Sequence, residues 1–273
     1  MIRNIIVFCI LCLACQATEP KPLLVVATYY AWGGDTPDGG SPSFVLYDDG
    51  TIICYHKPAY GEWPQIEKLY TTRKVVDAKK KSEELLSFDL SAAKSDYALT
   101  AATCQNETII WTPAKKIKIY GEWKEPRRFD PSMKNNPKFA GLIKRENELW
   151  KTLPDGIRQT LLNIEKEILI AGTPWLPEKI EIILSSYEHS PAKSVNWPKD
   201  WPSLNDKSTI KHSDSNYRIL FPTKRLAELE TFLASREING PVLIDGRKMS
   251  ALYRFPLPLD ALWTPEPLES FQE

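Results

Sequence analysis

The sequence predicts an α+β fold, in which an antiparallel, sheet-rich N-terminal part precedes a mixed helix and strand C-terminal part. Short runs of β-branched, aromatic and aliphatic residues, separated by turn residues, dominate residues 23–123. Longer apolar patterns at helical spacing follow residue 138, and strand signals then return. Helices and strands are therefore segregated rather than strictly alternating, which is typical of the α+β class. With 273 residues, 42% of them hydrophobic, the chain can build one large domain or two small ones.

The first residues have the layout of an export signal. Arg3 is followed by an uncharged apolar run from Ile5 to Ala14, and the first acidic residue is Glu19. As a helix this run would rise only about 15 Å, half of a hydrocarbon core of about 30 Å, so it is too short to span a bilayer. A charged start, a short apolar core and small residues beyond it indicate that residues 1–17 are a secretory signal.

The end of this signal resembles the lipobox of bacterial lipoproteins, in which small residues precede a cysteine that is acylated after cleavage. The stretch that carries the resemblance is "CLAC", with Ala14 directly before Cys15, although the two residues before Ala14 differ from the usual types. The resemblance implies an exported protein, held at the cell envelope (periplasm or outer membrane) by a lipid on Cys15. The alternative is a secreted protein cut near Ala17. In a eukaryotic source Asn106 would instead begin a glycosylation sequon.

A hairpin is expected at residues 44–55. The strand-forming residues 44–47 and 51–55 flank Asp48-Asp49-Gly50, and a three-residue hairpin loop favours a glycine in the left-handed region at its end. Aspartate in such a turn bonds its own backbone, so the two acids are interpreted as turn residues rather than as metal ligands. The other elements expected in this part are a strand at 23–32, a short helix capped by Ser82 and ending near 88, a second hairpin over 97–112, and a strand at 115–123.

Residues 124–137 are polar and contain proline, which predicts a linker or long loop before an α+β part at 138–265 and a tail at 266–273. Asn136 and Pro137 are expected to cap and begin a helix. Its apolar stripe comprises Phe139, Leu142, Ile143, Leu149, Trp150 and Leu153, and a second helix carries Ile157, Leu161, Ile164 and Ile168. The later elements expected are a strand near 178–187, an irregular region at 187–216, a strand at 217–221, a helix capped by Thr223 and ended by Asn239-Gly240, and a hairpin turning at Asp245-Gly246.

Charge and motifs exclude several classes of function. Lys plus Arg and Asp plus Glu both total 35, so no net basicity indicates a nucleic-acid partner. The sequence has no Gly-x-Ser-x-Gly, no His-Glu-x-x-His, no phosphate-binding glycine loop and, after the signal, no Cys-x-x-Cys. The sequence therefore assigns no catalytic residue, no metal ligand and no cofactor, and it favours a non-enzymatic protein.

Two cysteines remain after the signal, Cys54 and Cys104, and in an oxidising compartment they could form one disulfide. Cys54 and His56 would share one face of a strand, where a base can activate a thiol. Because Cys54 lies inside an apolar run, we disfavour that nucleophile.

The long region at 187–216 is the strongest candidate for a functional surface, because irregular segments of that length in compact domains are usually functional or disordered. Its "NWPKDWP" stretch places Trp197 and Trp201 four residues apart. Exposed together, the rings could bind a protein or a glycan, whereas buried rings would hold the loop on the core, which we favour. The function predicted is an exported, lipid-anchored binding or envelope-associated module. The alternatives are a secreted hydrolase with a dispersed site and an inhibitor or immunity-type protein that docks through the Trp197/Trp201 loop.

Overall fold

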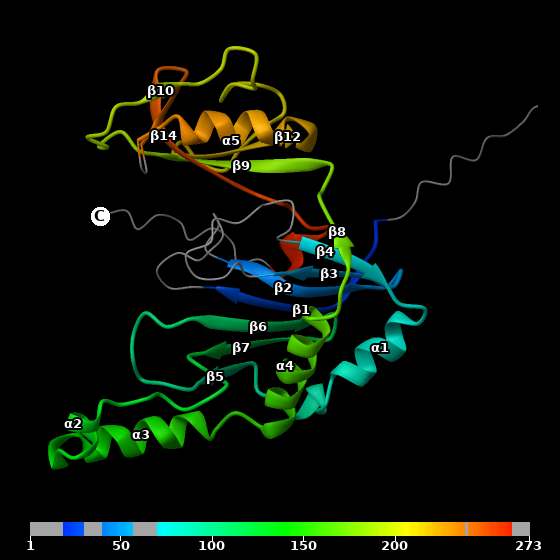
Figure 1. Cartoon of the computed structure of the whole chain (residues 1–273), viewed down its shortest axis with the longest axis vertical. Helices are drawn as coiled ribbons and strands as arrows, with labels where there is room; N and C mark the ends of the chain where they lie inside the picture. The colour runs from blue at the N-terminus through cyan, green and yellow to red at the C-terminus, as the bar shows by residue number, and fades with distance from the viewer. Residues whose placement is uncertain (1–18, 30–39, 57–69, 238–239, 264–273) are drawn as a thin grey trace, which may run out of the picture.

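The computed structural model describes residues 19–29, 40–56, 70–237 and 240–263, and it confirms the α+β class. The described chain forms an eight-stranded sheet in the order β5-β7-β6-β1-β2-β3-β4-β8 and a six-stranded sheet in the order β10-β13-β14-β9-β12-β11 (Figure 1). Cys15, with the rest of the signal, and the tail at 266–273 lie outside the described residues.

The eight-stranded sheet is mainly antiparallel and takes most of its strands from the N-terminal half. Its elements, with the helices between them, are β1 (Pro22–Tyr29), β2 (Gly40–Tyr47), β3 (Thr51–Tyr55), β4 (Tyr70–Lys74), α1 (Ala78–Leu85), η2 (Leu90–Ala92), β5 (Asp96–Ala98), β6 (Glu107–Thr112), β7 (Lys115–Tyr120) and β8 (Thr173–Pro174).

The hairpin predicted at 44–55 is confirmed by β2 and β3, which pair antiparallel. Gly50 has φ +83, the left-handed conformation that glycine adopts without steric cost. Asp49 behaves as a turn residue, because its carboxylate accepts hydrogen bonds from the Thr51 amide and hydroxyl, both at 2.9 Å. A Cβ at Gly50 would lie 2.2 Å from the carbonyl oxygen of Val75, so side-chain-bearing residues meet a clash there as well as backbone strain.

Two predictions in this half are wrong. The helix does not begin at Ser82, because Asp77 caps α1 through a bond to the Lys80 amide and Ser82 is a buried residue inside the helix. The segment 97–112 is not a hairpin either, because β5 pairs parallel with β7 and lies at the sheet edge. Strand β7 therefore lies between β5 and β6 in the sheet.

The middle of the chain is helical and packs partly on the first sheet. It comprises α2 (Pro131–Lys134), η3 (Pro137–Phe139), α3 (Ala140–Trp150) and α4 (Asp155–Ile168). Asn136 caps η3 as predicted, through a 3.0 Å bond to the Lys138 amide. The segment 124–137, expected to be a linker or long loop, contains α2. The two sheets are not divided at residue 138, because α4 covers the first sheet and β8 forms one of its edges. The predicted apolar stripe is buried only at its end, where Leu153 is 2% exposed and Trp150 packs against the same cluster; within α3 itself the buried residue is Glu146.

The six-stranded sheet is built from residues beyond 178. Its elements are β9 (Lys179–Ser186), β10 (Val195–Asn196), β11 (Thr209–Lys211), β12 (Asn216–Pro222), η4 (Thr223–Arg225), α5 (Leu226–Ala234), β13 (Val242–Ile244), β14 (Arg247–Arg254) and η5 (Asp260–Leu262). The predicted turn at Asp245-Gly246 is confirmed, with φ of 50 and 77. Thr223 does not cap the helix, because its hydroxyl donates to the Pro177 carbonyl at 2.5 Å. Asn239 lies outside the described residues.

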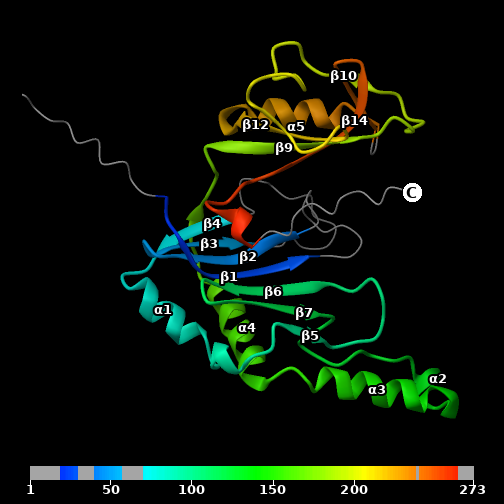
Figure 2. The same cartoon turned by 180° about the vertical axis from the view of Figure 1, so that it is seen from behind.

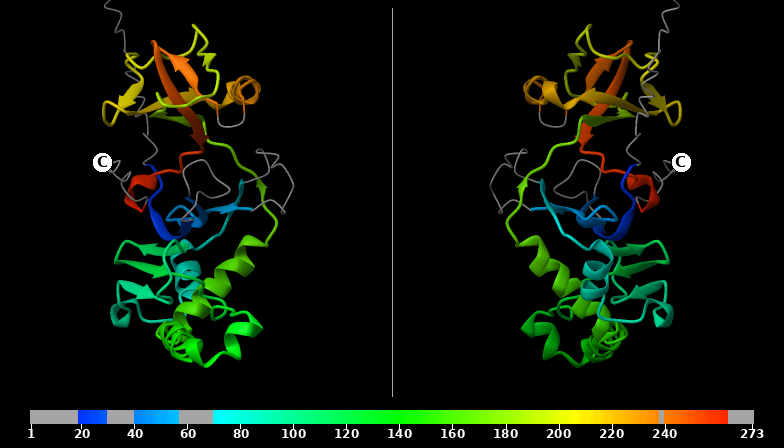
Figure 3. Two further views of the ribbon diagram at one scale, coloured as in Figure 1. Left: turned by 90° about the vertical axis from the view of Figure 1, so that its left-hand side faces the viewer. Right: turned by 90° about the vertical axis from the view of Figure 1, so that its right-hand side faces the viewer.

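Two hydrophobic clusters hold the fold together, one on each face of the eight-stranded sheet. Helices α1 and α4 cover one cluster, and Figures 2 and 3 show these helices on the side of the sheet away from η5. The other cluster continues into the six-stranded sheet through aromatic contacts, with the Tyr70 ring 5.9 Å from Phe255 and 5.8 Å from Trp175. The C-terminal segment closes this junction, since the Tyr47 hydroxyl donates to the Pro258 carbonyl at 3.1 Å and Trp263 is fully buried.

Candidate functional site

The two tryptophans of the long loop are buried, which confirms the expectation that at least one would be. Trp197 is 8% exposed and Trp201 is 7% exposed. Their ring centroids are 5.1 Å apart, and Trp201 also packs against Phe221 at 4.7 Å and Phe232 at 5.2 Å. Edge-to-face contacts of this kind stabilise a core beyond the area they bury. The rings therefore fasten the loop to α5 and the sheet, and they do not stand exposed together.

Hydrogen bonds explain why a segment expected to be irregular can be ordered. Residues 195–196 form the short parallel strand β10 beside β13, and the Trp197 amide donates to the Leu243 carbonyl at 2.9 Å. The Trp197 indole donates to the Pro202 carbonyl at 3.0 Å, which closes the loop on itself. Asp245 in the hairpin turn accepts from the Leu204 amide at 2.9 Å. Buried backbone groups in this loop are thus satisfied by the sheet edge.

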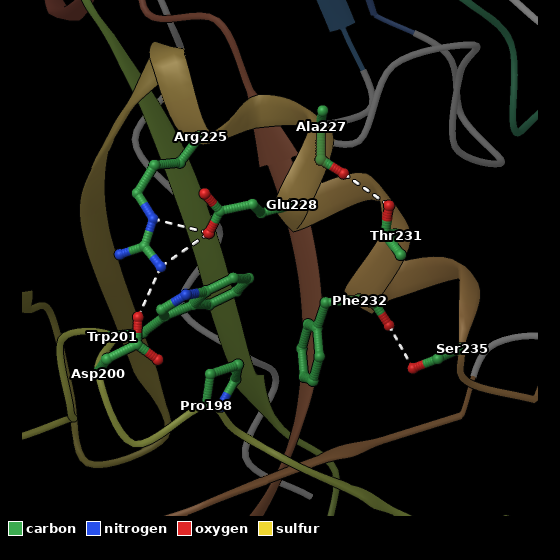
Figure 4. A pocket seen from close by; sticks show the side chains of 9 residues that line it. All are labelled: Pro198, Asp200, Trp201, Arg225, Ala227, Glu228, Thr231, Phe232 and Ser235. Atoms are coloured by element: carbon green, nitrogen blue, oxygen red, sulfur yellow. Dashed lines mark hydrogen bonds and ion pairs between the residues drawn. The ribbon is translucent and has the colours of Figure 1, made fainter.

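A groove lies between this loop and α5. It is open to solvent and has a volume of about 700 Å³. Its lining residues are Pro198, Asp200, Trp201, Arg225, Ala227, Glu228, Thr231, Phe232 and Ser235. Pro198 and the two aromatic rings form an apolar floor, and the charged side chains stand at one end (Figure 4).

The charged end of the groove is a guanidinium held by two carboxylates. Arg225 donates to Glu228 at 2.9 Å through Nε and to Asp200 at 2.6 Å through Nη2. The hydrogen bond from Arg225 lowers the pKa of Asp200. The pKa of Arg225 is raised, first by its hydrogen bond to Glu228 and second by its hydrogen bond to Asp200. The guanidinium also lies 5.5 Å from the ring centroid of Trp201, a cation–π contact. The cluster therefore pairs one guanidinium with two carboxylates.

The hydroxyls of the groove are not arranged for chemistry. The Thr231 hydroxyl donates to the Ala227 carbonyl at 2.8 Å and the Ser235 hydroxyl to the Phe232 carbonyl at 2.6 Å. Both therefore satisfy the backbone of α5, and no lining residue is a histidine or a cysteine that could activate them. The groove can bind an apolar group beside a polar one, and its lining provides no nucleophile with a base.

The cysteine and histidine considered as a nucleophilic pair are placed on β3 and just after it. Burial raises the pKa of the Cys54 thiol to about 11, so this thiol stays neutral at physiological pH. His56 makes its hydrogen bond to the Thr71 hydroxyl, with Nε2 2.7 Å from Oγ1. Cys54 is a packing residue in this arrangement.

The disulfide considered between Cys54 and Cys104 is not formed, and this expectation is corrected. Cys54 is buried in β3, whereas Cys104 is exposed in the connection before β6, and both are free. Strands β1 and β2 separate β3 from β6 in the sheet, so the two thiols are not brought together.

A second charged cluster, on the sheet face away from α5, is structural. Glu181 of β9 is 5% exposed and binds Arg218 at 3.2 Å and Arg254 of β14. Arg254 also binds Asp260 of η5 at 2.8 Å. Burial raises the pKa of Asp260, while Arg254 opposes that rise. Because each buried charge has an opposite partner, the cluster fastens the C-terminal segment to the sheet.

Sequence reasoning missed the residues that η4 and α5 contribute to the groove. Arg225 and Glu228 at i and i+3 are a visible pairing signal, but helix periodicity alone gives no reason to place Asp200 beside them.

Among the described residues no group of three or more His, Cys, Asp or Glu could hold a metal ion. Within the same residues, none of the helices has the length and apolar character that crossing a bilayer requires.

No protein-family model matches this chain, and no curated protein or solved structure is significantly similar to it.

Proposed function

We propose that this protein is exported from a bacterial cell, is held at the cell envelope by a lipid on Cys15, and acts by binding a protein partner in the groove beside α5. The observation that carries the binding proposal is the composition of that groove. It joins an apolar floor to an ion-paired end, which is the composition of small recognition sites on protein surfaces.

The geometry favours a protein over a glycan as the partner. Sugar recognition by stacking needs an open aromatic face, whereas Trp201 is only 7% exposed and is covered by Arg225. The charged end has two carboxylates for one guanidinium. A fitting partner would place an apolar side chain on Pro198 and Phe232 and a cationic side chain near Asp200.

Photo-crosslinking in the cell of origin tests the groove. A photoreactive side chain at Thr231, which is exposed on the groove wall, should give a discrete adduct with one protein. Ala227→Arg should abolish the adduct because it fills the groove from the exposed surface of α5. Ala234→Arg is the matched control, since Ala234 is exposed on the same helix but does not line the groove. An adduct that survives Ala227→Arg unchanged would remove the groove as the binding surface.

Anchoring is tested separately by the intact mass of the protein extracted from membranes. Cleavage before Cys15 predicts a mature chain that lacks residues 1–14 and carries acyl chains. Cys15→Ser should release the protein into the soluble fraction. A water-soluble wild-type product that begins at Thr18 or later would contradict the anchor and leave the groove proposal untouched.

A further inference from the structure

One helical segment is rich in Lys and Arg. We call it the basic arm and define it as residues 131–151, covering α2, η3 and α3. The arm contains five Lys and Arg and two Glu, a net charge of +3. The whole chain has 35 of each sign, so the remainder carries a net charge of −3. A neutral total therefore hides a charge asymmetry that the sequence average does not reveal.

The basic arm extends from the end of the molecule farthest from the six-stranded sheet (Figures 1 and 2). Glu146 attaches it to the body by accepting hydrogen bonds from the Thr100 hydroxyl at 2.6 Å and the Ala101 amide at 2.9 Å. No other residue of α3 is buried. The C-terminal end of α3 is attached as well, because Trp150 packs against the cluster below the first sheet and Arg158 lies 3.6 Å from its ring centroid. The rest of the helix is presented to solvent.

The cations of the arm are available to an external partner. Lys144 has a long 3.9 Å contact to Glu148, and both side chains are more than half exposed. Among the described residues, no carboxylate forms an ion pair with the arm's other cations, which are Lys134, Lys138, Arg145 and Lys151. Apolar residues stand among these cations, with Leu142 39% exposed and Met133 and Phe139 half-buried.

We propose that the basic arm docks this protein onto an anionic lipid bilayer. Cations interleaved with partly exposed apolar residues on an amphipathic helix fit a negatively charged headgroup layer, into which the apolar side chains can dip. The rest of the chain carries a net charge of −3, so its overall charge adds no attraction to the same surface. This inference goes beyond the groove and does not depend on acylation of Cys15.

Co-sedimentation with vesicles tests the docking. The chain beginning at Thr18 is suitable, because every described helix and strand lies after that residue and no lipid is attached. It should pellet with vesicles of equal parts phosphatidylglycerol and phosphatidylcholine, and not with pure phosphatidylcholine. Raising the salt concentration should release it, since screening shortens the range of the attraction.

The triple variant Lys134→Gln, Lys138→Gln, Arg145→Gln should lower the binding constant by on the order of a hundredfold, because each cation near an anionic surface contributes about a fivefold gain. The matched control is Lys79→Gln, Lys80→Gln, Lys224→Gln, which removes the same charge from exposed positions on α1 and η4 and should change binding far less. Both triples alter only exposed side chains, and circular dichroism verifies that they fold. Equal losses in the two triples, or no pelleting of the unaltered chain with anionic vesicles, would overturn the proposal.

Discussion

Replacing Trp201 by alanine should destabilise the C-terminal half strongly, because this ring holds the long loop, α5 and β12 together. Its centroid lies 5.1 Å from Trp197, 4.7 Å from Phe221 and 5.2 Å from Phe232. Truncation of a buried tryptophan costs about 3–5 kcal/mol, and each aromatic pair adds about 0.5–1.5 kcal/mol beyond area. We therefore expect a loss near the upper end of that range, about 4–5 kcal/mol.

The assay is thermal unfolding followed by far-UV circular dichroism, which does not depend on the fluorescence of the removed indole. At about 2–4 °C per kcal/mol for a chain of this size, the midpoint should fall by roughly 8–20 °C. Tyr187→Ala is the matched control, since Tyr187 stands at the start of the same loop with 38% of its surface exposed. It should shift the midpoint only slightly, as surface substitutions do.

If Trp201→Ala and Tyr187→Ala unfolded at the same temperature, the loop would not be held by the buried rings. The binding surface proposed beside α5 would then lose its rigid floor, and the docking hypothesis with exposed rings would regain support. Stability, not binding, is the decisive readout here.

Three further predictions concern the first sheet and the hairpin turns. Gly50→Ala should lower the free energy of unfolding by more than about 1 kcal/mol, and clearly by more than Gly246→Ala. Both glycines have positive φ, but a Cβ meets no atom within 4 Å at Gly246. Chemical denaturation of both variants measures the difference, and equal losses of stability would contradict the clash at Gly50. Burial lowers the pKa of His56, so the unfolded chain binds the proton more readily, and stability should fall as pH drops below about 6.5. In His56→Gln this part of the pH dependence should disappear. If the variant and the unaltered protein showed the same pH dependence of unfolding between about pH 5 and 7.5, the prediction would be refuted. In the chain beginning at Thr18, Cys104 should react with a thiol reagent in the native state and Cys54 only after unfolding, because Cys54 is buried with its thiol pKa raised to about 11. Two rapidly reacting thiols in the native state would refute this prediction. If no thiol reacted even after unfolding, a disulfide between the two cysteines would again be the better explanation.

Elements specified by neighbouring residues were predictable from the sequence. The turn at Asp48-Asp49-Gly50 carries its own signal, because glycine supplies the positive φ and Asp49 bonds the backbone two residues on. The amphipathic helix α4 was found through its apolar spacing, and Ile157, Leu161 and Ile164 are buried as expected. In both cases the physical cause lies within a few residues.

Predictions failed where the deciding contact was distant in sequence. The stripe over 139–153 has helical periodicity, yet only its end is packed: Leu153 is buried and Trp150 contacts the same cluster, whereas Leu142 is 39% exposed. The parallel pairing of β5 with β7 and the position of β8 at the edge of the first sheet likewise depend on partners that local propensity does not identify.

The sequence by itself determined the α+β class, the turns at Asp48-Asp49-Gly50 and Asp245-Gly246, and the cap at Asn136, because each depends on residue types a few positions apart. Tertiary structure alone decided that Trp197 and Trp201 are buried, that Arg225 of η4 meets Asp200 of the loop, and that the charge of residues 131–151 is presented on one projecting arm. The reason is that burial and charge pairing are properties of surfaces that form when distant segments pack, and one sequence pattern is compatible with a ring in the core or a ring in solvent.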